Sequence, residues 1–125
     1  MQKVTATELE LLKLLWDRGE LTARQIAEVL YPECSASDIG TVHSMLKRLE
    51  RKKAVRRSRR THPHRFSAKV TVQQIAGFEL GAIADKLSEG SMAPFLLHLV
   101  SAKKLTREEA DEIRQLLKNY NPSNG

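Results

Sequence analysis

The sequence predicts a mainly α-helical protein that contains one small β-hairpin. Two observations indicate this class. Apolar residues recur at helical spacing in six stretches, and four of these begin with a Thr-x-x-Glu/Gln box, in which side chains and backbone N–H groups hydrogen-bond reciprocally. Between the third and fourth stretches, two short runs flank a turn-prone segment that contains Pro63, a pattern typical of a hairpin.

The first two predicted helices each follow a capping box. One covers residues 6–18 and ends at Gly19, which suits the left-handed backbone found at many helix ends. The next opens at Thr22 and ends before Pro32, because proline lacks the N–H that continues a helix. The side chains predicted to be buried are Leu9, Leu11, Leu12, Leu15 and Trp16 in the first helix, and Ile26, Val29 and Leu30 in the second.

The third predicted helix is capped by Ser37 or Asp38 and runs to about Lys52. Its buried side consists of Val42, Met45, Leu46 and Leu49. A hairpin with strands at residues 55–58 and 64–67 follows. Three helices followed by a hairpin is the order of a winged helix-turn-helix, in which the third helix enters the major groove of DNA and the hairpin lies along the backbone.

Three further helices are predicted after residue 70. The first opens at Thr71, the second is a short apolar helix of residues 92–102 capped by Ser91, and the third opens at Thr106. Residues 91–117 are more apolar than a short appendage could bury alone, so a C-terminal α-helical dimerisation unit is expected. Its predicted residues are Ile75, Phe78, Ile83, Leu87, Met92, Phe95, Leu96, Leu99, Val100, Ile113, Leu116 and Leu117. The expected domains are residues 1–70 for DNA binding and 71–120 for dimerisation, with a disordered tail at 121–125.

Charge divides the chain in the same way. Residues 1–70 carry 15 Lys/Arg against 8 Asp/Glu, whereas residues 71–125 carry 6 against 7. Ten of the Lys/Arg lie between Lys47 and Arg65, together with a single acid, Glu50. Apolar-patterned segments enclose this run, which does not fit a disordered basic tail. The asymmetry therefore indicates that the amino-terminal half binds a polyanion such as nucleic acid.

The third helix and the hairpin are predicted to supply the DNA contacts. Opposite its buried side, helical geometry turns small polar and basic side chains outward. Arg48 can pair in bidentate fashion with a guanine edge or a phosphate, whereas lysines suit phosphates. The predicted DNA-binding residues are Thr41, His43, Ser44, Lys47, Arg48, Arg51 and Lys52 on the helix, Arg57, Arg59, Arg60 and Arg65 in the hairpin, and Thr22 and Arg24 at the start of the second helix.

Several stretches resemble the penicillinase-repressor family of bacterial winged-helix repressors, which includes the methicillin-resistance and copper-transport repressors. The resemblance covers about residues 5–117. It rests on Thr7–Trp16 (TELELLKLLW), on Gly40–Lys52 (GTVHSMLKRLERK), which is similar to the family's recognition helix, and on Gly90–Val100 and Leu105–Ile113, which resemble its dimerisation helices. The resemblance implies a homodimer that binds a palindromic operator and blocks transcription. It also implies that Thr41, Ser44 and Arg48 face the DNA.

The sequence departs from the family pattern at three places. Lys53 stands where the family usually has glycine after the recognition helix. Antibiotic-responsive members are cut by a membrane sensor protease at an Asn-Phe bond in the fifth helix, and the matching bond here is His98–Leu99. Copper-sensing members end in a paired Cys-x-Cys motif, whereas this chain has no cysteine after Cys34. These departures argue against copper sensing and place proteolytic induction in question.

No catalytic residue, cofactor or metal site is predicted, so the chain is expected not to be an enzyme. His43, His62, His64 and Cys34 invite a metal site, but the surrounding arginines would repel a cation. A single cysteine fits a reducing compartment. The amino terminus lacks an apolar leader, and no apolar run approaches the roughly 18 residues of a membrane span. A cytoplasmic protein without a membrane partner is therefore expected.

Two functions are compatible with these features. The first is a sequence-specific transcriptional repressor. The second is a nonspecific nucleic-acid-binding structural protein of nucleoid or ribosome type. The second would share the basic surface, but it would need neither the polar side chains of the third helix nor a dimerisation unit.

Overall fold

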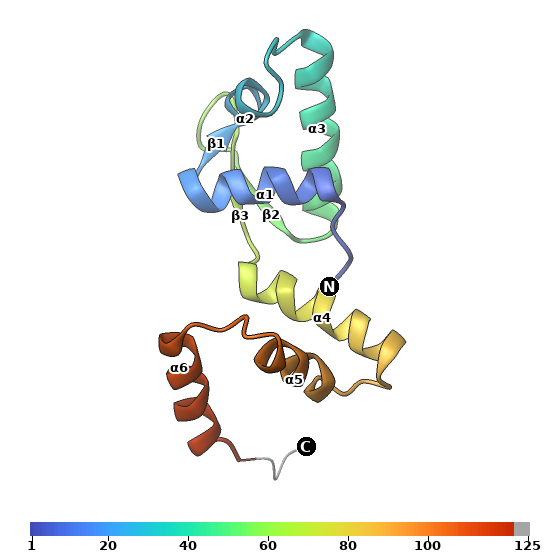
Figure 1. The fold of residues 1–125 in the computed structure, drawn as a ribbon. Coiled ribbons are helices and arrows are strands. Elements are labelled where there is room, and N and C mark those ends of the chain that lie inside the picture. Colours follow the sequence, from blue (N-terminus) through green and yellow to red (C-terminus); the bar gives the residue numbers. More distant parts are fainter. Residues whose placement is uncertain (122–125) are drawn as a thin grey trace. The chain divides into compact units, whose positions relative to one another are not determined.

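The computed structural model describes residues 1–121, which contain six helices and three short strands (Figure 1). The predicted class, mainly α-helical with a small hairpin, is confirmed. In chain order the elements are α1 (Ala6–Arg18), β1 (Leu21–Thr22), α2 (Ala23–Leu30), α3 (Ala36–Arg51), β2 (Val55–Ser58), β3 (Arg65–Ala68), α4 (Val72–Leu87), α5 (Ala93–Ser101) and α6 (Arg107–Lys118). Within the described residues, no helix is both long enough and apolar enough to cross a membrane.

The predicted hairpin is formed by β2 and β3, with Val55 opposite Ala68 and Ser58 opposite Arg65. A third strand, β1, pairs antiparallel with the other edge of β3, so the strand order is β1–β3–β2. The sequence did not indicate β1, because two residues are too few for an alternating pattern. Thr22 pairs with Arg65 and is also the N-cap of α2, so β1 fixes the start of α2 beside the hairpin.

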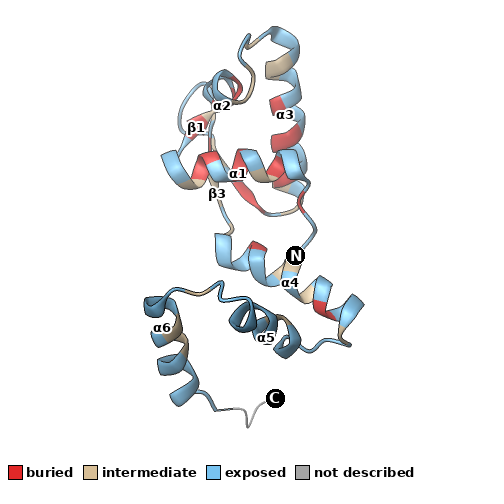
Figure 2. Ribbon diagram, in the orientation of Figure 1, coloured by how far each residue is buried: buried red, intermediate tan, exposed pale blue. Residues whose placement is uncertain are grey.

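The core of the amino-terminal unit lies between α1, α2, α3 and the sheet, where buried residues are red in Figure 2. Phe66 of β3 is almost fully buried in this core, and β3 packs against α1. The indole Nε1 of Trp16 donates a hydrogen bond to the backbone carbonyl of Val70 at 2.8 Å, which ties the segment after the hairpin to α1. The predicted buried sides of α1 and α3 contribute Leu11, Leu12, Leu15, Val42, Met45, Leu46 and Leu49.

Two details predicted for α1 and α2 are wrong. Val29 is exposed, because the eight-residue α2 buries only Ala23, Ile26 and Ala27. Gly19 caps α1 with φ 80° and ψ −136°, so its backbone is not in the left-handed helical region. From this conformation the chain passes directly into β1.

The caps of α3 and α5 also differ from expectation. Ser35, rather than Ser37, is the N-cap of α3, and Asp38 closes the reciprocal box from three residues further on. In α5 the N-cap is Met92 without a side-chain hydrogen bond, so Ser91 does not cap this helix. Both predictions failed because a capping side chain can be chosen only once the first helical residue is known.

The chain divides into two compact units, Met1–Glu79 and the residues from Leu80 onward, and it passes from one to the other within α4. The predicted division after residue 70 stays a prediction. Of the predicted tail at 121–125, only Asn121 lies among the described residues. In the second unit, Ala84 is the only buried hydrophobic residue among those described, and neither α5 nor α6 contains a buried residue (Figure 2).

Candidate nucleic-acid interface

Helix α3 has one buried side and three others, which face solvent, α1 and the hairpin. Its apolar side chains fix the rotation of the helix, because Val42, Met45, Leu46 and Leu49 are all at most 1% exposed. Directly opposite lies a solvent-facing row, spaced four, three and four residues apart. We call it the outward row: Gly40, Ser44, Lys47 and Arg51, all exposed. This row is the part of α3 that can approach another molecule without any rearrangement of the unit.

The side of α3 nearest α1 carries Thr41, Arg48 and Lys52, spaced seven and four residues apart. Glu8 of α1 is completely buried and faces this side. Its carboxylate accepts hydrogen bonds from Lys52 Nζ at 2.6 Å and from Arg48 Nε at 3.3 Å. Lys52 Nζ also donates to the backbone carbonyl of Lys3 at 2.8 Å. Lys52 is therefore largely engaged within the protein, whereas Arg48, 46% exposed, reaches solvent beyond Glu8.

Glu8 is held in its ionised form by these partners. Burial alone would raise the pKa of Glu8, but hydrogen bonds from Lys52, from the Thr5 backbone N–H and from Arg48 outweigh it and lower the pKa below its ordinary value. The Thr5 bond belongs to the capping box of α1. A single carboxylate thus completes the start of α1 and holds two basic side chains of α3.

The side of α3 nearest the hairpin carries His43 and Glu50. Arg57 of β2 binds Glu50 through two bonds, Nη2–Oε1 at 2.7 Å and Nε–Oε2 at 3.2 Å. The guanidinium also lies 4.9 Å from the centre of the Phe66 ring and donates to His64 Nδ1 at 3.3 Å. Arg57 therefore braces the hairpin against α3, and few of its donors remain free for a ligand.

The surroundings of His64 disfavour its charged form. Loss of solvent and the positive charges of Arg57 and Arg59 lower the pKa of His64 below its ordinary value. A neutral ring is also what the Arg57 contact requires, because Nδ1 must then accept a hydrogen bond.

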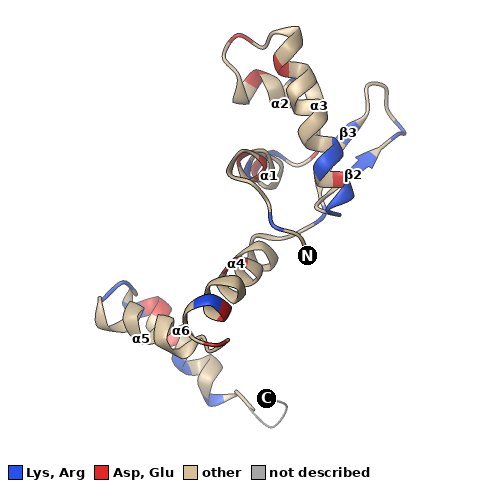
Figure 3. Cartoon of the chain, turned by 90° about the vertical axis from the view of Figure 1, so that its right-hand side faces the viewer, with Lys and Arg blue, Asp and Glu red and all other residues tan. Residues whose placement is uncertain are grey.

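The other predicted hairpin residues remain at the surface. Arg59, Arg60 and Arg65 are exposed, and the hairpin and the end of α3 are marked in blue by Lys and Arg in Figure 3. Arg56 is exposed as well and was missed by the sequence analysis. Its signal is the alternation along β2, which turns Arg56 outward where Arg57 turns toward Glu50.

The residues predicted at the start of α2 have partners of their own. The Thr22 hydroxyl accepts from the Gln25 backbone N–H at 3.2 Å as part of the capping box. Arg24 is exposed and lies 3.3 Å from Glu28 one turn later. Such an exposed ion pair contributes little free energy, so Arg24 remains available to bind another anion.

The predicted dimerisation residues are mostly at the surface of this single chain. Ile75 differs, because it is buried in the core of the amino-terminal unit. Phe78, Phe95 and Ile113 are half-buried. The exposed members are Ile83, Leu87, Met92, Leu96, Leu99, Val100, Leu116 and Leu117. The His98–Leu99 bond lies within α5, and both of its residues are exposed.

Among residues 1–121, no group of three or more His, Cys, Asp or Glu side chains is arranged to hold a metal ion. An outward row of polar and basic side chains on α3, beside an arginine-rich hairpin, defines a winged-helix DNA-binding regulator. Residues 4–119 match the family described as Penicillinase repressor. The chain therefore belongs to the penicillinase repressor family, and the resemblance seen in the sequence is confirmed.

A comparison with curated proteins finds no match. Among solved structures, the chain is similar to the oxidised and reduced forms of MarR from E. coli, each with 23% sequence identity and a TM-score of 0.46. These matches cover 93% of this chain and 74% and 76% of the two MarR chains. A mutant MarR from E. coli complexed with operator DNA matches with 24% identity and a TM-score of 0.43, covering 93% of this chain and 74% of that one.

Proposed function

We propose that the protein is a sequence-specific transcriptional repressor that binds a palindromic operator as a homodimer. The observation that carries the proposal is the outward row of α3, which is free of internal partners and lies between two basic flanks. Family membership supports the same role. A third helix of this kind inserts into the major groove, and a twofold dimer places two such helices on half-sites about one helical turn apart, or a multiple of it.

The side chains of α3 divide the work of recognition. Ser44, Lys47 and Arg51 reach base edges and phosphates from the outward row. Arg48 adds a contact through its terminal nitrogens, because Glu8 binds its Nε and orients the guanidinium. Lys52 and Arg57 act mainly within the protein, holding α3 to α1 and the hairpin to α3.

The dimer is supported by the second unit. Its helices expose large apolar side chains, including Leu87 at 74% and Leu116 at 71%. Exposed apolar surface of this extent in a small unit is typical of a protein–protein interface. In homodimers of twofold symmetry the same patch serves both subunits. The proposal assigns no proteolytic step to this chain, because His98–Leu99 differs from the Asn-Phe bond at both residues.

The decisive experiment is selection of bound fragments from the source genome, followed by affinity measurements on the selected palindrome and a scrambled duplex at one stated salt concentration. A specific repressor should prefer the palindrome by roughly 10³-fold or more. A ratio near one would overturn the proposal and favour a nonspecific nucleic-acid-binding structural protein.

Variants of α3 add a second criterion. Arg48→Ala should weaken binding to the palindrome more than to scrambled DNA, whereas Lys104→Ala in the second unit should change neither. If Arg48→Ala weakened both duplexes equally, the side chain would be a phosphate contact and would carry no sequence preference.

A further inference from the structure

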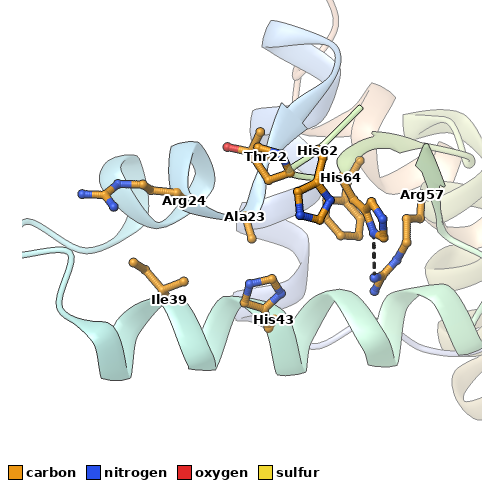
Figure 4. A pocket seen from close by; sticks show the side chains of 10 residues that line it. Thr22, Ala23, Arg24, Ile39, His43, Arg57, His62 and His64 are labelled. Atoms are coloured by element: carbon orange, nitrogen blue, oxygen red, sulfur yellow. Dashed lines mark hydrogen bonds between the residues drawn. The ribbon is translucent and has the colours of Figure 1, made fainter. Parts of the chain in front are cut away.

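A cleft of about 280 Å³ lies where the start of α2, the middle of α3 and the hairpin loop come together (Figure 4). Three histidines line it: His43 from α3, and His62 and His64 from the hairpin. In Figure 4 these rings point toward the same space. The chain has four histidines in all, and the fourth, His98, lies in α5. His64 accepts a hydrogen bond from Arg57 and meets His62 edge-on, with the ring centroids 6.0 Å apart, whereas no hydrogen bond within the described residues engages the ring of His43 or His62.

The electrostatic environment of the cleft favours an anion. Arg24 and Arg57 line it, and Arg59 lies close enough to affect His64. The nearby carboxylates are paired with these arginines, Glu50 with Arg57 in bidentate fashion and Glu28 with Arg24 in an exposed pair. Arg59 adds a positive charge that no carboxylate of residues 1–121 pairs with. The floor is apolar, formed by Ala23, Ile39 and Phe66. This lining disfavours a cation and suits an anion that accepts N–H bonds.

The cleft adjoins the proposed DNA-binding surface. His43 precedes Ser44 of the outward row and lies one helical turn before Lys47. When α3 enters the major groove, the side of the helix nearest the hairpin approaches the sugar–phosphate backbone. Of the anions in a protein–DNA complex, a backbone phosphate is therefore the one expected at this position.

We propose that the three-histidine cleft binds a backbone phosphate of the operator, and that its histidines take up protons when DNA binds. This inference rests on the proposed function and makes DNA affinity dependent on pH. Histidine is the side chain that ordinarily exchanges a proton between pH 5 and 8. A phosphate held against the rings favours their charged form, so the complex binds more protons than the free protein.

The direction of the pH dependence follows from linkage. A histidine whose pKa is higher in the complex than in the free protein strengthens DNA binding. Its contribution is fully present when the pH is below the pKa that the histidine has in the free protein. That contribution is lost as pH rises through the higher pKa of the complex. The charged groups beside the rings are Arg24, Arg57, Arg59 and Glu50, and His62 and His64 also face each other, with the ring centroids 6.0 Å apart. DNA should therefore bind more tightly as pH falls from 8 to 6.

His64 has an additional part in this exchange. In the free protein, the loss of solvent and the charge of Arg57 lower the pKa of His64. Protonation places a hydrogen on Nδ1, so the ring can no longer accept from Arg57 Nη1. The released Nη1 then has a donor free for the incoming phosphate, while the bonds from Arg57 to Glu50 are kept.

The test measures affinity for the selected palindrome and for scrambled DNA between pH 6 and 8 at constant salt. The affinity of the wild-type protein for both duplexes should be at least about tenfold higher at pH 6 than at pH 7.5. The triple variant His43→Gln, His62→Gln, His64→Asn should lose most of this slope, and His98→Gln should keep it. Asparagine at position 64 retains an acceptor for Arg57.

Two further measurements keep the result interpretable. Calorimetry in two buffers of different ionisation enthalpy should detect proton uptake by the wild-type protein when DNA binds. The single variant His43→Gln, at an exposed helix position, should reduce that uptake even if the triple variant folds poorly. A flat wild-type pH profile, or an unchanged slope in the histidine variants, would overturn the inference. A missing preference for the palindrome would instead refute the proposed repressor, because the pH slope is read on both duplexes.

Discussion

At the scale of single residues, Glu8 does more than complete a capping box, because it also binds two side chains of α3. Its two carboxylate oxygens serve the Thr5 backbone, Lys52 and Arg48 at once. A buried carboxylate needs such partners, because an unpaired charge away from water is strongly unfavourable. Glu8 therefore fixes α1 against the basic end of α3.

Glu8→Gln tests this role. The substitution should lower the free energy of unfolding at pH 7 by about 2 kcal/mol, less than for a fully enclosed pair because Arg48 reaches solvent. The pKa of Glu8 is lowered in the folded state, so its stabilisation is present above the ordinary value of 4.5 and is lost as pH falls through the folded pKa. Urea unfolding from pH 3 to 7 should show a shallower acid loss in the variant. Identical slopes would contradict the assignment.

Lys53 directly follows Lys52, the C-cap residue of α3. Its φ is 61°, in the left-handed region, and it closes the helix end through two backbone bonds, Lys53 N to Glu50 O at 3.0 Å and Ala54 N to Leu49 O at 2.8 Å. A non-glycine residue held there is strained by about 1 kcal/mol.

Lys53→Gly should therefore raise the free energy of unfolding by about 1 kcal/mol, as measured by urea denaturation. Lys53→Ala is the matched control, because it removes the charge and keeps the strained backbone. Equal stabilisation by both variants would show that charge repulsion, and not the backbone, is being relieved.

At the scale of elements, the hairpin is positioned by side-chain contacts more than by backbone pairing between its short strands. With four-residue strands, β2 and β3 have little backbone pairing of their own. The contacts of Arg57 with Glu50 and with the Phe66 ring connect the hairpin to α3 and to the core. The two elements proposed to contact DNA are thus held in a fixed relative position by contacts within the protein.

A double-mutant cycle on Glu50→Gln and Arg57→Ala measures this brace. The coupling free energy should be about 1–2 kcal/mol, because the pair is bidentate and only partly exposed. Both single variants should also bind DNA more weakly, because the hairpin then loses its fixed position. Arg56→Ala, one residue away and exposed, is the control and should leave stability unchanged. A coupling near zero would mean that the hairpin is held by β1 and Phe66 alone.

At the scale of the whole molecule, the two units differ in what they can do alone. The first has a continuous core of side chains from α1, α2, α3 and the sheet. The second has helices with well-formed ends, including the capping box of α6, but almost no buried apolar side chains of its own. Helices without a core are marginal in water, so the proposed homodimer would supply the second unit with the apolar contacts that it lacks.

Leu116→Glu should convert the proposed dimer into a monomer in sedimentation equilibrium at micromolar concentration. Binding to the two-half-site operator should then weaken by about 100-fold, because the second half-site is no longer engaged by a tethered subunit. Gln115→Glu, the neighbouring residue on α6 with the same added charge, should leave the dimer intact. A wild-type monomer, or a dimer that survives Leu116→Glu, would contradict this interface.

The sequence by itself determined the fold class and the order of the six helices and the hairpin. Capping boxes at Thr5, Thr22, Thr71 and Thr106 define helix starts by local hydrogen bonds, which need no distant partner. Apolar spacing likewise identified the buried side of α3 and hence its outward row. The basic run between Lys47 and Arg65 indicated where a polyanion is expected to bind, because charge density can be read from the sequence alone.

Only the tertiary structure decided which of those basic residues are free. Lys47 and Lys52 are the same type of residue, yet Glu8 binds Lys52, whereas Lys47 is exposed. In the same way, Glu50 binds Arg57, whereas Arg56 is exposed. Glu8 and Lys52 are 44 residues apart, and such a pairing depends on how α1 crosses α3. Strand β1, the meeting of His43 with the hairpin histidines, and the burial of Ile75 have the same origin. Each depends on contacts between segments distant in the chain, which no local pattern encodes.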